Sequence, residues 1–588
     1  MATYIRLTDY KSSDAKEQEF FNLENRYEAK QEDFYKITGY PIAYWVSSNV
    51  HNIFNKGIRL KKFGDTRQGM ATSDNNRFLR SWFEVDIDSS GFNFNNAIDA
   101  SKSSYKWFPY NKGGEAKKWY GNLEFLINYE NDGFEVKEYA SKLYKTYSRT
   151  IKSIDRYFER CISWSKVSSS GLSLRYFPNG FAFDVAGCSI FENDNELFYI
   201  MALLNTKLQD PLISSISPTI NFEAGQLANV PIIFPKQASV KEKIEIITQQ
   251  NIDISKEEWD SRETSWDFTK NELIKHKSDS KIETAYTSFY NYWKEQHNTL
   301  HQNEEELNRL FIDIYELQDE LTPDVELKDI TILKNETKIV DDELVFQVDE
   351  IMKQFISYGV GVMFGRYSLD SDRLLIANMG QEIPSQAEND KVTFEIDDDN
   401  VIPVLEDDYF KDDIASRFVQ FVKATFGEEY LSENIRFIES SLGTTLRKYF
   451  VKGFYEDHIK RYKKRPIYWM VASPKKSFMS LIYMHRYEAD TFARVRNSYL
   501  TEYITKLEAH KETLTLTTSS DTASDRDKKD ADKQMKNIDT KLKEIIEFDR
   551  DKMMSWSQNP TEIDLDDGVK VNYCKFKDIL YPITGLCK

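Results

Sequence analysis

The stretch RQGMATSDNNRFLRSWF, at residues 67–83, combines residue types that suit contact with a nucleic acid. Its glycine and asparagine residues let a loop approach a ligand closely, and its hydroxyl and amide groups can hydrogen-bond to phosphate. Arginines can contact phosphate or reach the O6 and N7 atoms of guanine. The composition is equally compatible with an ordinary charged surface loop. If the loop binds DNA, its contacts come from the side chains of Arg67, Thr72, Asn75, Asn76, Arg77 and Arg80.

The region around this loop is basic although the chain carries a formal net charge of −18. Residues 56–80 hold seven lysines and arginines against two aspartates, and Lys61 and Lys62 are among the seven. Because the distribution of charge matters more than its sum, an acidic protein can still present a DNA-binding face.

A second basic segment, residues 447–476, holds ten lysines and arginines against two acidic residues. Its densest part is Lys463, Lys464 and Arg465. These cations can bind phosphates without sequence preference, pair with the acidic residues 395–413, or contact a protein partner. The sequence does not favour one of these three roles.

Two further segments of the first half join cations to aromatic or hydroxyl groups. Residues 105–133 interleave lysine with tryptophan and tyrosine, which suits stacking and charge neutralisation on nucleic acid but also suits an aromatic core beside lysines. Residues 160–187 place cations on both sides of a Ser/Gly loop. The candidate contacts of these two segments are Lys112, Lys117, Lys118, Trp119, Lys166, Ser168 and Arg175. That three candidate clusters fall within 200 residues strengthens the DNA-binding hypothesis.

The sequence offers no catalytic or metal-binding motif. It has no Pro-Pro dipeptide, and hence no [DN]PP[YF] motif for a flipped adenine, and it has no GxxxxGK phosphate loop. His297 and His301 are four residues apart, but a solvated helix face explains them better than a zinc site. The four cysteines form no CxxC pair, so neither a disulfide framework nor a zinc site is expected, and a reducing cytoplasm fits. No apolar run approaches the length needed to span a bilayer.

The apolar periodicity and the turn residues along the chain predict an α+β protein of several parts. We expect a mostly helical lead-in at 1–40, a loop-rich mixed region at 41–235, and a long helical spacer at 236–325. A second α+β domain is expected at 326–588, with a solvated loop near 511–534 between two charged helices.

Several long and unusual segments of this chain resemble the C-terminal half of PglX-type enzymes, the adenine-specific DNA methyltransferases of BREX phage-defence systems. These enzymes in turn resemble type IIG restriction-modification enzymes. The segments that carry the resemblance are KWFPYNKGGEAKKWYGNLEFLINYENDG, ISWSKVSSSGLSLRYFPNGFAFDVAG, EEELNRLFIDIYELQDELTPDV, SYGVGVMFGRYSLD, LRKYFVKGFYEDHIKRYKKRPIYWMVASP, LIYMHRYEADT and IDLDDGVKVNY. RQGMATSDNNRF is similar to the loop of target-recognition domains in that class, with Ser73 where the usual pattern has glycine.

The resemblance implies that residues 41–235 are a target-recognition domain that reads double-stranded DNA. The family's N-terminal part, which binds S-adenosylmethionine and methylates adenine N6, is not among the parts that this chain resembles. Catalysis and the cofactor are therefore expected in an N-terminal methyltransferase domain or chain, with other BREX proteins as further partners and no membrane association. The alternative is a protein-interaction scaffold of the BREX complex whose contact with DNA is incidental.

Overall fold

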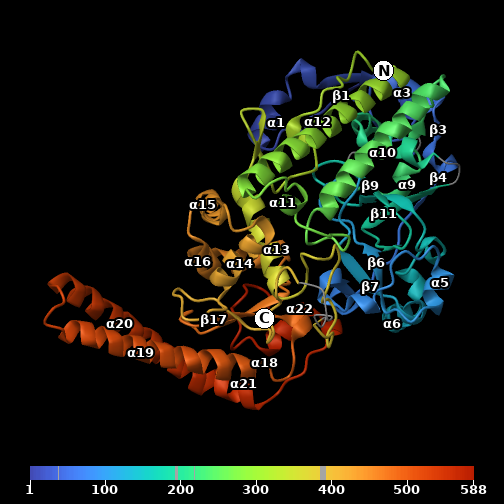
Figure 1. Cartoon of the computed structure of the whole chain (residues 1–588). Helices are drawn as coiled ribbons and strands as arrows, with labels where there is room; N and C mark the ends of the chain where they lie inside the picture. Colours follow the sequence, from blue (N-terminus) through green and yellow to red (C-terminus); the bar gives the residue numbers. More distant parts are fainter. Residues whose placement is uncertain (38, 193–195, 218, 384–391, 588) are drawn as a thin grey trace.

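The chain folds into small β-sheets surrounded by helices, which confirms the predicted α+β class. The computed structural model describes residues 1–37, 39–192, 196–217, 219–383 and 392–587. Figure 1 shows the body of the molecule, from which one long helical hairpin extends. Within the described ranges, no helix is both long and apolar enough to cross a membrane.

Two four-stranded sheets occupy the region between residues 64 and 192. Their strand orders are β10-β6-β7-β5 and β4-β11-β8-β9, and only the β10–β6 pair is parallel. Every residue of β6 and β8 is buried, so both faces of these strands are covered. The eight strands are β4 (Gly64–Arg67), β5 (Leu79–Ser81), β6 (Trp107–Asn111), β7 (Phe125–Asn128), β8 (Cys161–Ser165), β9 (Leu174–Phe177), β10 (Ala182–Phe183) and β11 (Gly187–Glu192).

The helices predicted over residues 236–325 pack against α7, which lies on the second sheet, rather than hold the sheet at a distance. α7 (Leu197–Asn205) contacts β8, β9 and β11, and both α10 (Ala238–Asp260) and α12 (Ile282–Ile314) contact α7. Figure 1 shows α10 and α12 running side by side. Apolar residues at helical spacing, such as Trp293 and Leu300, are fully buried. The expected spacer is therefore a packed layer of the body, because its apolar stripe has the second sheet and α7 to bury itself against.

The lead-in expected to be mostly helical also contains a small two-stranded sheet. β1 (Ala2–Ile5) pairs antiparallel with β2 (Arg26–Ala29), and the helices between and after them, α1 (Ser13–Glu19) and α2 (Gln31–Phe34), are short. The register sets Tyr4 opposite Tyr27. Cross-strand aromatic pairing of this kind stabilises strands that local propensity leaves undecided.

The last part of the chain combines a three-stranded sheet with helices. The apolar runs in RPIYWMVAS and FMSLIYMHRY form β16 (Tyr468–Ala472) and β17 (Met479–Tyr483), and β15 (Ile402–Pro403) completes the sheet. The surrounding helices include α13 (Val348–Met363), α14 (Ile414–Phe426), α15 (Leu431–Leu442), α17 (Tyr455–Arg461) and α22 (Gly568–Lys575).

The solvated loop expected near 511–534 is mostly helical. α19 (Thr501–Ser519) and α20 (Asp525–Phe548) form the projecting hairpin of Figure 1, and only residues 520–524 connect them. Ser524 caps α20 through a capping box with Asp527, and Ala531 and Ile538 are buried. A polar sequence therefore stays helical because a strong cap and a narrow apolar seam support it.

The expectation of no disulfide is also wrong, because Cys574 and Cys587 are bonded. The two residues come together where the chain turns back after α22, with their Cα atoms 5.4 Å apart. Their separation of 13 positions has no recognisable motif, which is why the sequence gives no sign of the bond. Cys161 and Cys188 are free and buried.

Candidate nucleic-acid interface

Three connections converge at one edge of the two sheets. The segment after β4 meets the β10–β11 connection, since Met70 N donates to Phe183 O (2.8 Å) and Val185 N donates to Met70 O (3.0 Å). A Cβ atom added to Gly69 would lie 1.9 Å from Phe183 O, so only glycine permits this approach. Lys112, which directly follows β6, joins the same edge through Asp184.

A pocket of about 310 Å³ lies elsewhere in the molecule, whereas the one at this edge measures about 260 Å³. The walls of the edge pocket come from the connections described above: Ala71, Thr72, Ser73, Asn75, Lys112, Asp184 and Val185. We call these seven residues the rim pocket. It unites three of the residues predicted to bind DNA, Thr72, Asn75 and Lys112, although 40 positions separate the first from the last.

The polar groups of the rim pocket are arranged to present donors. Thr72 Oγ1 donates to Asn75 Oδ1 (2.6 Å), which occupies the amide oxygen and leaves the Asn75 NH₂ group available. Lys112 Nζ is 2.5 Å from Asp184 Oδ2, and Tyr110 OH donates to the same oxygen (2.8 Å). Burial and the nearby carboxylate raise the pKa of Tyr110, so its hydroxyl stays a donor. The Asn75 amide and the Lys112 ammonium line the pocket and are donors that suit phosphate oxygens and base-edge acceptors, whereas the buried Tyr110 hydroxyl holds Asp184 in place.

Lys166 lies beside the rim pocket, whereas the backbone N–H of Ser168 donates to Ile220 O (3.2 Å). Lys166 N donates to Ala186 O (2.8 Å), next to Val185 of the pocket. The Lys166 ammonium is 2.9 Å from Glu223, a partly exposed carboxylate that Gln68 also contacts. An exposed pair of this kind is weak enough to be exchanged for a phosphate.

A cationic segment beside the pocket was not among the predicted DNA contacts. Ala71 N donates to Thr150 O (2.8 Å) and Ser153 Oγ donates to Gln68 O (2.9 Å), so residues 150–153 lie beside the pocket, and the segment 145–149 leads into them. Lys145, Arg149 and Lys152 are exposed there, and none of them makes an ion pair with any described residue. The signal was present, because KTYSRTIK holds three cations and no acidic residue.

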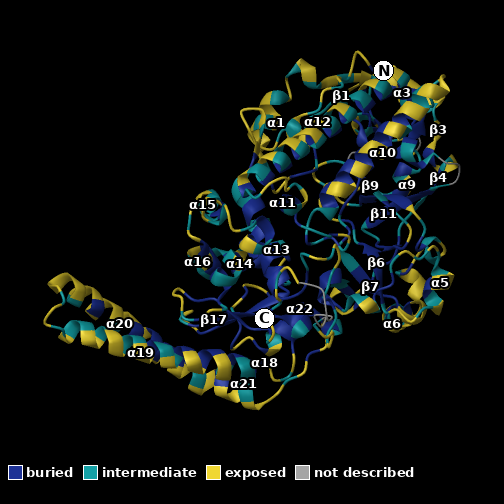
Figure 2. Ribbon diagram, viewed as in Figure 1, coloured by how far each residue is buried: buried dark blue, intermediate teal, exposed yellow. Residues whose placement is uncertain are grey.

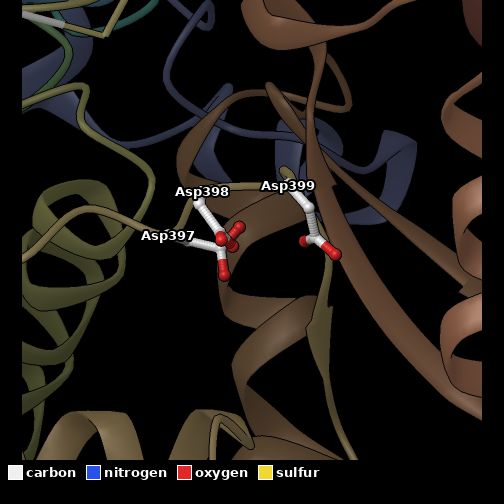
Figure 3. A group of neighbouring side chains, drawn as sticks. All are labelled: Asp397, Asp398 and Asp399. Carbon is white, nitrogen blue, oxygen red and sulfur yellow. The ribbon is translucent and has the colours of Figure 1, made fainter.

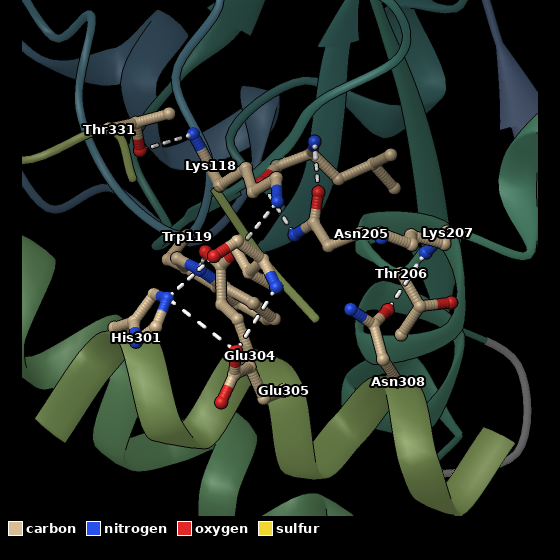
Figure 4. A network of polar contacts seen from close by, with 12 residues as sticks. Lys118, Trp119, Asn205, Thr206, Lys207, His301, Glu304, Glu305, Asn308 and Thr331 are labelled. Carbon is tan, nitrogen blue, oxygen red and sulfur yellow. Dashed lines mark hydrogen bonds and ion pairs between the residues drawn. The ribbon is translucent and has the colours of Figure 1, made fainter. Parts of the chain in front are cut away.

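The structure corrects the predicted role of residues 117–119 and of Arg175, which lie in the interior. Lys117 pairs with the fully buried Glu258 of α10 (2.8 Å). Figure 4 shows Lys118 and Trp119 directed at Glu304 of α12, at 2.6 Å and 2.8 Å. Burial lowers the pKa of Lys117, and neither it nor Trp119 is open to a duplex. Carboxylates from distant parts of the chain thus occupy the cations that were expected to bind DNA phosphates.

Arg175 holds the loop that carries Lys112 in place. Its side chain is fully buried, and its guanidinium donates to Lys117 O (3.3 Å) and Ser165 Oγ (3.3 Å). Burial lowers the pKa of this guanidinium to about 10. Arg175 is therefore a positioning residue and not a contact.

The arginines of the opening loop are engaged within the protein. Arg67 pairs with Asp65 (2.8 Å), and Arg77 pairs with Glu135 (2.5 Å). Arg80 Nε donates to the carbonyl of Asp566 (2.8 Å), a residue of the IDLDDG segment. Arg67 and Arg77 stay partly exposed and able to exchange partners, whereas Arg80 joins two distant parts of the chain. Asn76 is exposed on the same loop, in α4 (Asn75–Phe78).

The cations predicted at 463–465 join the C-terminal region to the first sheet. Lys463 pairs with Glu124 (2.5 Å), and Arg465 lies 3.4 Å from the buried Glu84. Lys464 donates to Thr584 O (3.1 Å). Of the three roles left open for residues 447–476, the structure displays pairing with carboxylates. Arg447 pairs with Asp413 of the acidic residues 395–413, whereas Lys463 and Arg465 use carboxylates of the first half of the chain. Lys61 and Lys62 are exposed before β4, at the opposite end of that strand from the rim pocket.

One group of carboxylates could be considered for a metal ion, Asp397, Asp398 and Asp399 (Figure 3). Burial raises the pKa of Asp397 to about 7, with Asp399 adding to the effect and Arg417 opposing it. Backbone N–H of Val401 donates to both Asp397 and Asp399, so the group is accounted for as a hydrogen-bonded turn.

One edge of the two sheets thus combines a small polar pocket, a close backbone approach that only glycine permits, and exposed cations that make no ion pair with described residues. Along nearly its whole length the chain is homologous to part of an adenine-specific methyltransferase. Its relatives include BrxX of Escherichia coli O9:H4 (strain HS) and PglX of Lacticaseibacillus casei (strain Zhang), both described as adenine-specific methyltransferases.

The identity is 36% with each relative, over 99% of this chain for BrxX and 98% for PglX. The chain spans about half the length of these curated relatives, 48% of each. No protein-family model matches it. The resemblance inferred from the sequence is therefore confirmed as homology to BrxX and PglX.

Proposed function

We propose that this chain is the DNA sequence-recognition part of a PglX-type adenine-N6 DNA methyltransferase that acts in host methylation and phage defence. The recognition region, residues 41–235, binds a duplex at the rim pocket. Lys145, Arg149 and Lys152 contact phosphates and set the register, while Asn75 and Lys112 donate to base edges. The observation that carries the proposal is the convergence of these side chains from separate connections on one edge.

The methyl transfer itself belongs to the part of the enzyme that this chain does not span. A methyltransferase acting on adenine must take the base out of the duplex and hold it in a pocket. S-adenosylmethionine and the flipped adenine would be held by that other part, as a domain or as a partner chain. This chain contributes placement and specificity.

A protein-interaction scaffold remains the second candidate. It is favoured by the internal pairing of Arg67, Arg77, Arg80 and residues 463–465, which leaves fewer free cations than the sequence suggests. Charge reversal at those arginines would break internal contacts, so it does not separate the candidates.

The triple variant Lys145→Glu, Arg149→Glu, Lys152→Glu does separate them, because these three residues make no ion pair with the described residues. Recognition predicts that the variant loses salt-sensitive binding to double-stranded DNA and still co-purifies with the other half of the methyltransferase. The scaffold hypothesis predicts unchanged DNA binding. Circular dichroism of the variant, matched to the parent, verifies that the fold survives.

A further inference from the structure

Exposed apolar side chains gather in the first 42 residues. The described chain has 24 exposed large hydrophobic residues, and seven of them lie in this short segment, about four times the share that an even spread would give. Phe21 and Leu23 are each 73% exposed and Tyr35 is 70% exposed. The seven residues are Met1, Phe20, Phe21, Leu23, Tyr35, Tyr40 and Ile42.

This segment is attached to the body by a narrow connection. Tyr4 stacks on Tyr44 with ring centroids 4.7 Å apart, Tyr44 OH donates to Ile5 O (3.4 Å), and Arg6 lies over the ring of Trp45. Among the described residues, hydrogen bonds, ion pairs and aromatic contacts of residues 1–42 reach no further than Trp45. Figure 2 shows exposed surface along α1, at the margin of the body.

The two-stranded sheet in this segment lacks the partners that such a unit needs. β1 pairs only with β2 in the described chain, so both outer edges of the two strands are open. A two-stranded sheet is marginally stable in water, and an open edge is a template for pairing with another strand. An open edge and several exposed aromatic side chains on one small unit point to a surface that another protein covers.

We propose that residues 1–42 are the docking surface for the part of a BrxX/PglX-type methyltransferase that this chain does not span. This inference rests on the proposed function. The relatives extend over about twice the length that this chain matches, so each of them contains a further part of similar size. The contact buries Phe21, Leu23 and Tyr35 in apolar pockets and extends the β1–β2 pair by a strand.

The test measures association of this chain with the other half of the methyltransferase from the same source, expressed as a separate tagged chain. The double variant Phe21→Glu, Leu23→Glu places charges in the proposed contact. We expect its dissociation constant, measured by biolayer interferometry, to rise at least tenfold. The matched control is Leu516→Glu, since Leu516 is also 73% exposed but lies on the projecting hairpin, and its constant should change less than twofold.

The first double variant could disturb the fold of the neighbouring α1. A second double variant, Tyr35→Glu with Tyr40→Glu, therefore tests the same surface at positions away from α1. The inference is overturned if both double variants bind like the parent, or if the parent itself does not bind the other half. It is also overturned if sedimentation shows a dimer of this chain that the variants abolish, because the occupant is then a second copy. DNA binding is measured on the same variants, and its retention separates failure of this inference from failure of the proposed function.

Discussion

Neutralising the free cations beside the rim pocket tests the electrostatic part of the account quantitatively. The variant Lys145→Gln, Arg149→Gln, Lys152→Gln removes three side chains that are exposed and make no ion pair with described residues. Each phosphate contact contributes about −0.9 to the slope of log K against log salt concentration, so three contacts contribute about −2.7. When the salt concentration rises from 50 to 200 mM, the salt dependence of these three contacts alone weakens DNA binding by the parent roughly forty-fold.

The assay is fluorescence anisotropy of a labelled duplex across that salt range. We expect the slope of the variant to be shallower than that of the parent by about two to three units. The control variant Lys529→Gln, Lys533→Gln, Lys536→Gln removes the same number of exposed, unpaired lysines from α20, and its slope should match the parent. If the two variants have equal slopes, the segment 145–152 does not contact the duplex and the reasoning fails.

Two further predictions concern buried ionisable side chains. Replacing Glu258 by alanine leaves Lys117 and Arg262 buried without their shared carboxylate. We therefore expect the free energy of unfolding, measured by urea denaturation, to fall by about 3–5 kcal/mol. A loss below about 1 kcal/mol would contradict the role assigned to Glu258. Burial, with Arg366 adding to it, lowers the pKa of His485 to about 3. The folded state therefore favours the neutral ring, and stability falls as pH drops below the ordinary histidine pKa. Between pH 7 and pH 5 the parent should lose about 2 kcal/mol more than a His485→Gln variant, and equal losses would refute the depressed pKa.

Periodicity predicted the elements better than it predicted their contacts. The short apolar runs in LEFLINYE and RPIYWMVAS mark β7 and β16, and apolar residues at intervals of three and four over 282–314 mark α12. The hairpin α19–α20 was missed in part because its apolar seam is narrow, with buried residues such as Ala531 and Ile538 far apart in a polar sequence. Local pattern carries little information where tertiary packing supplies most of the stability.

The candidate site was predictable in composition and not in geometry. Thr72, Asn75 and Lys112 share residue types that bind phosphate, but nothing in the sequence indicates that strands β4 and β6 end beside each other. Lys118 carries the same signal, yet Glu304 of α12 lies 186 positions away and pairs with it. Cations in an aromatic segment serve a buried interface as readily as a nucleic acid, and only the fold decides which.

Mapping methylated adenines tests the central claim most directly. Cells or reconstituted complexes that carry Asn75→Ala, or Lys112→Met together with Asp184→Asn so that no buried carboxylate is left unpaired, are compared with the parent by single-molecule sequencing. If the rim pocket reads base edges, the loss of one contact costs about 1–3 kcal/mol of discrimination, and the methylated motif becomes degenerate at one or more positions. An unchanged motif, methylated to the parental extent in both variants, would contradict the account.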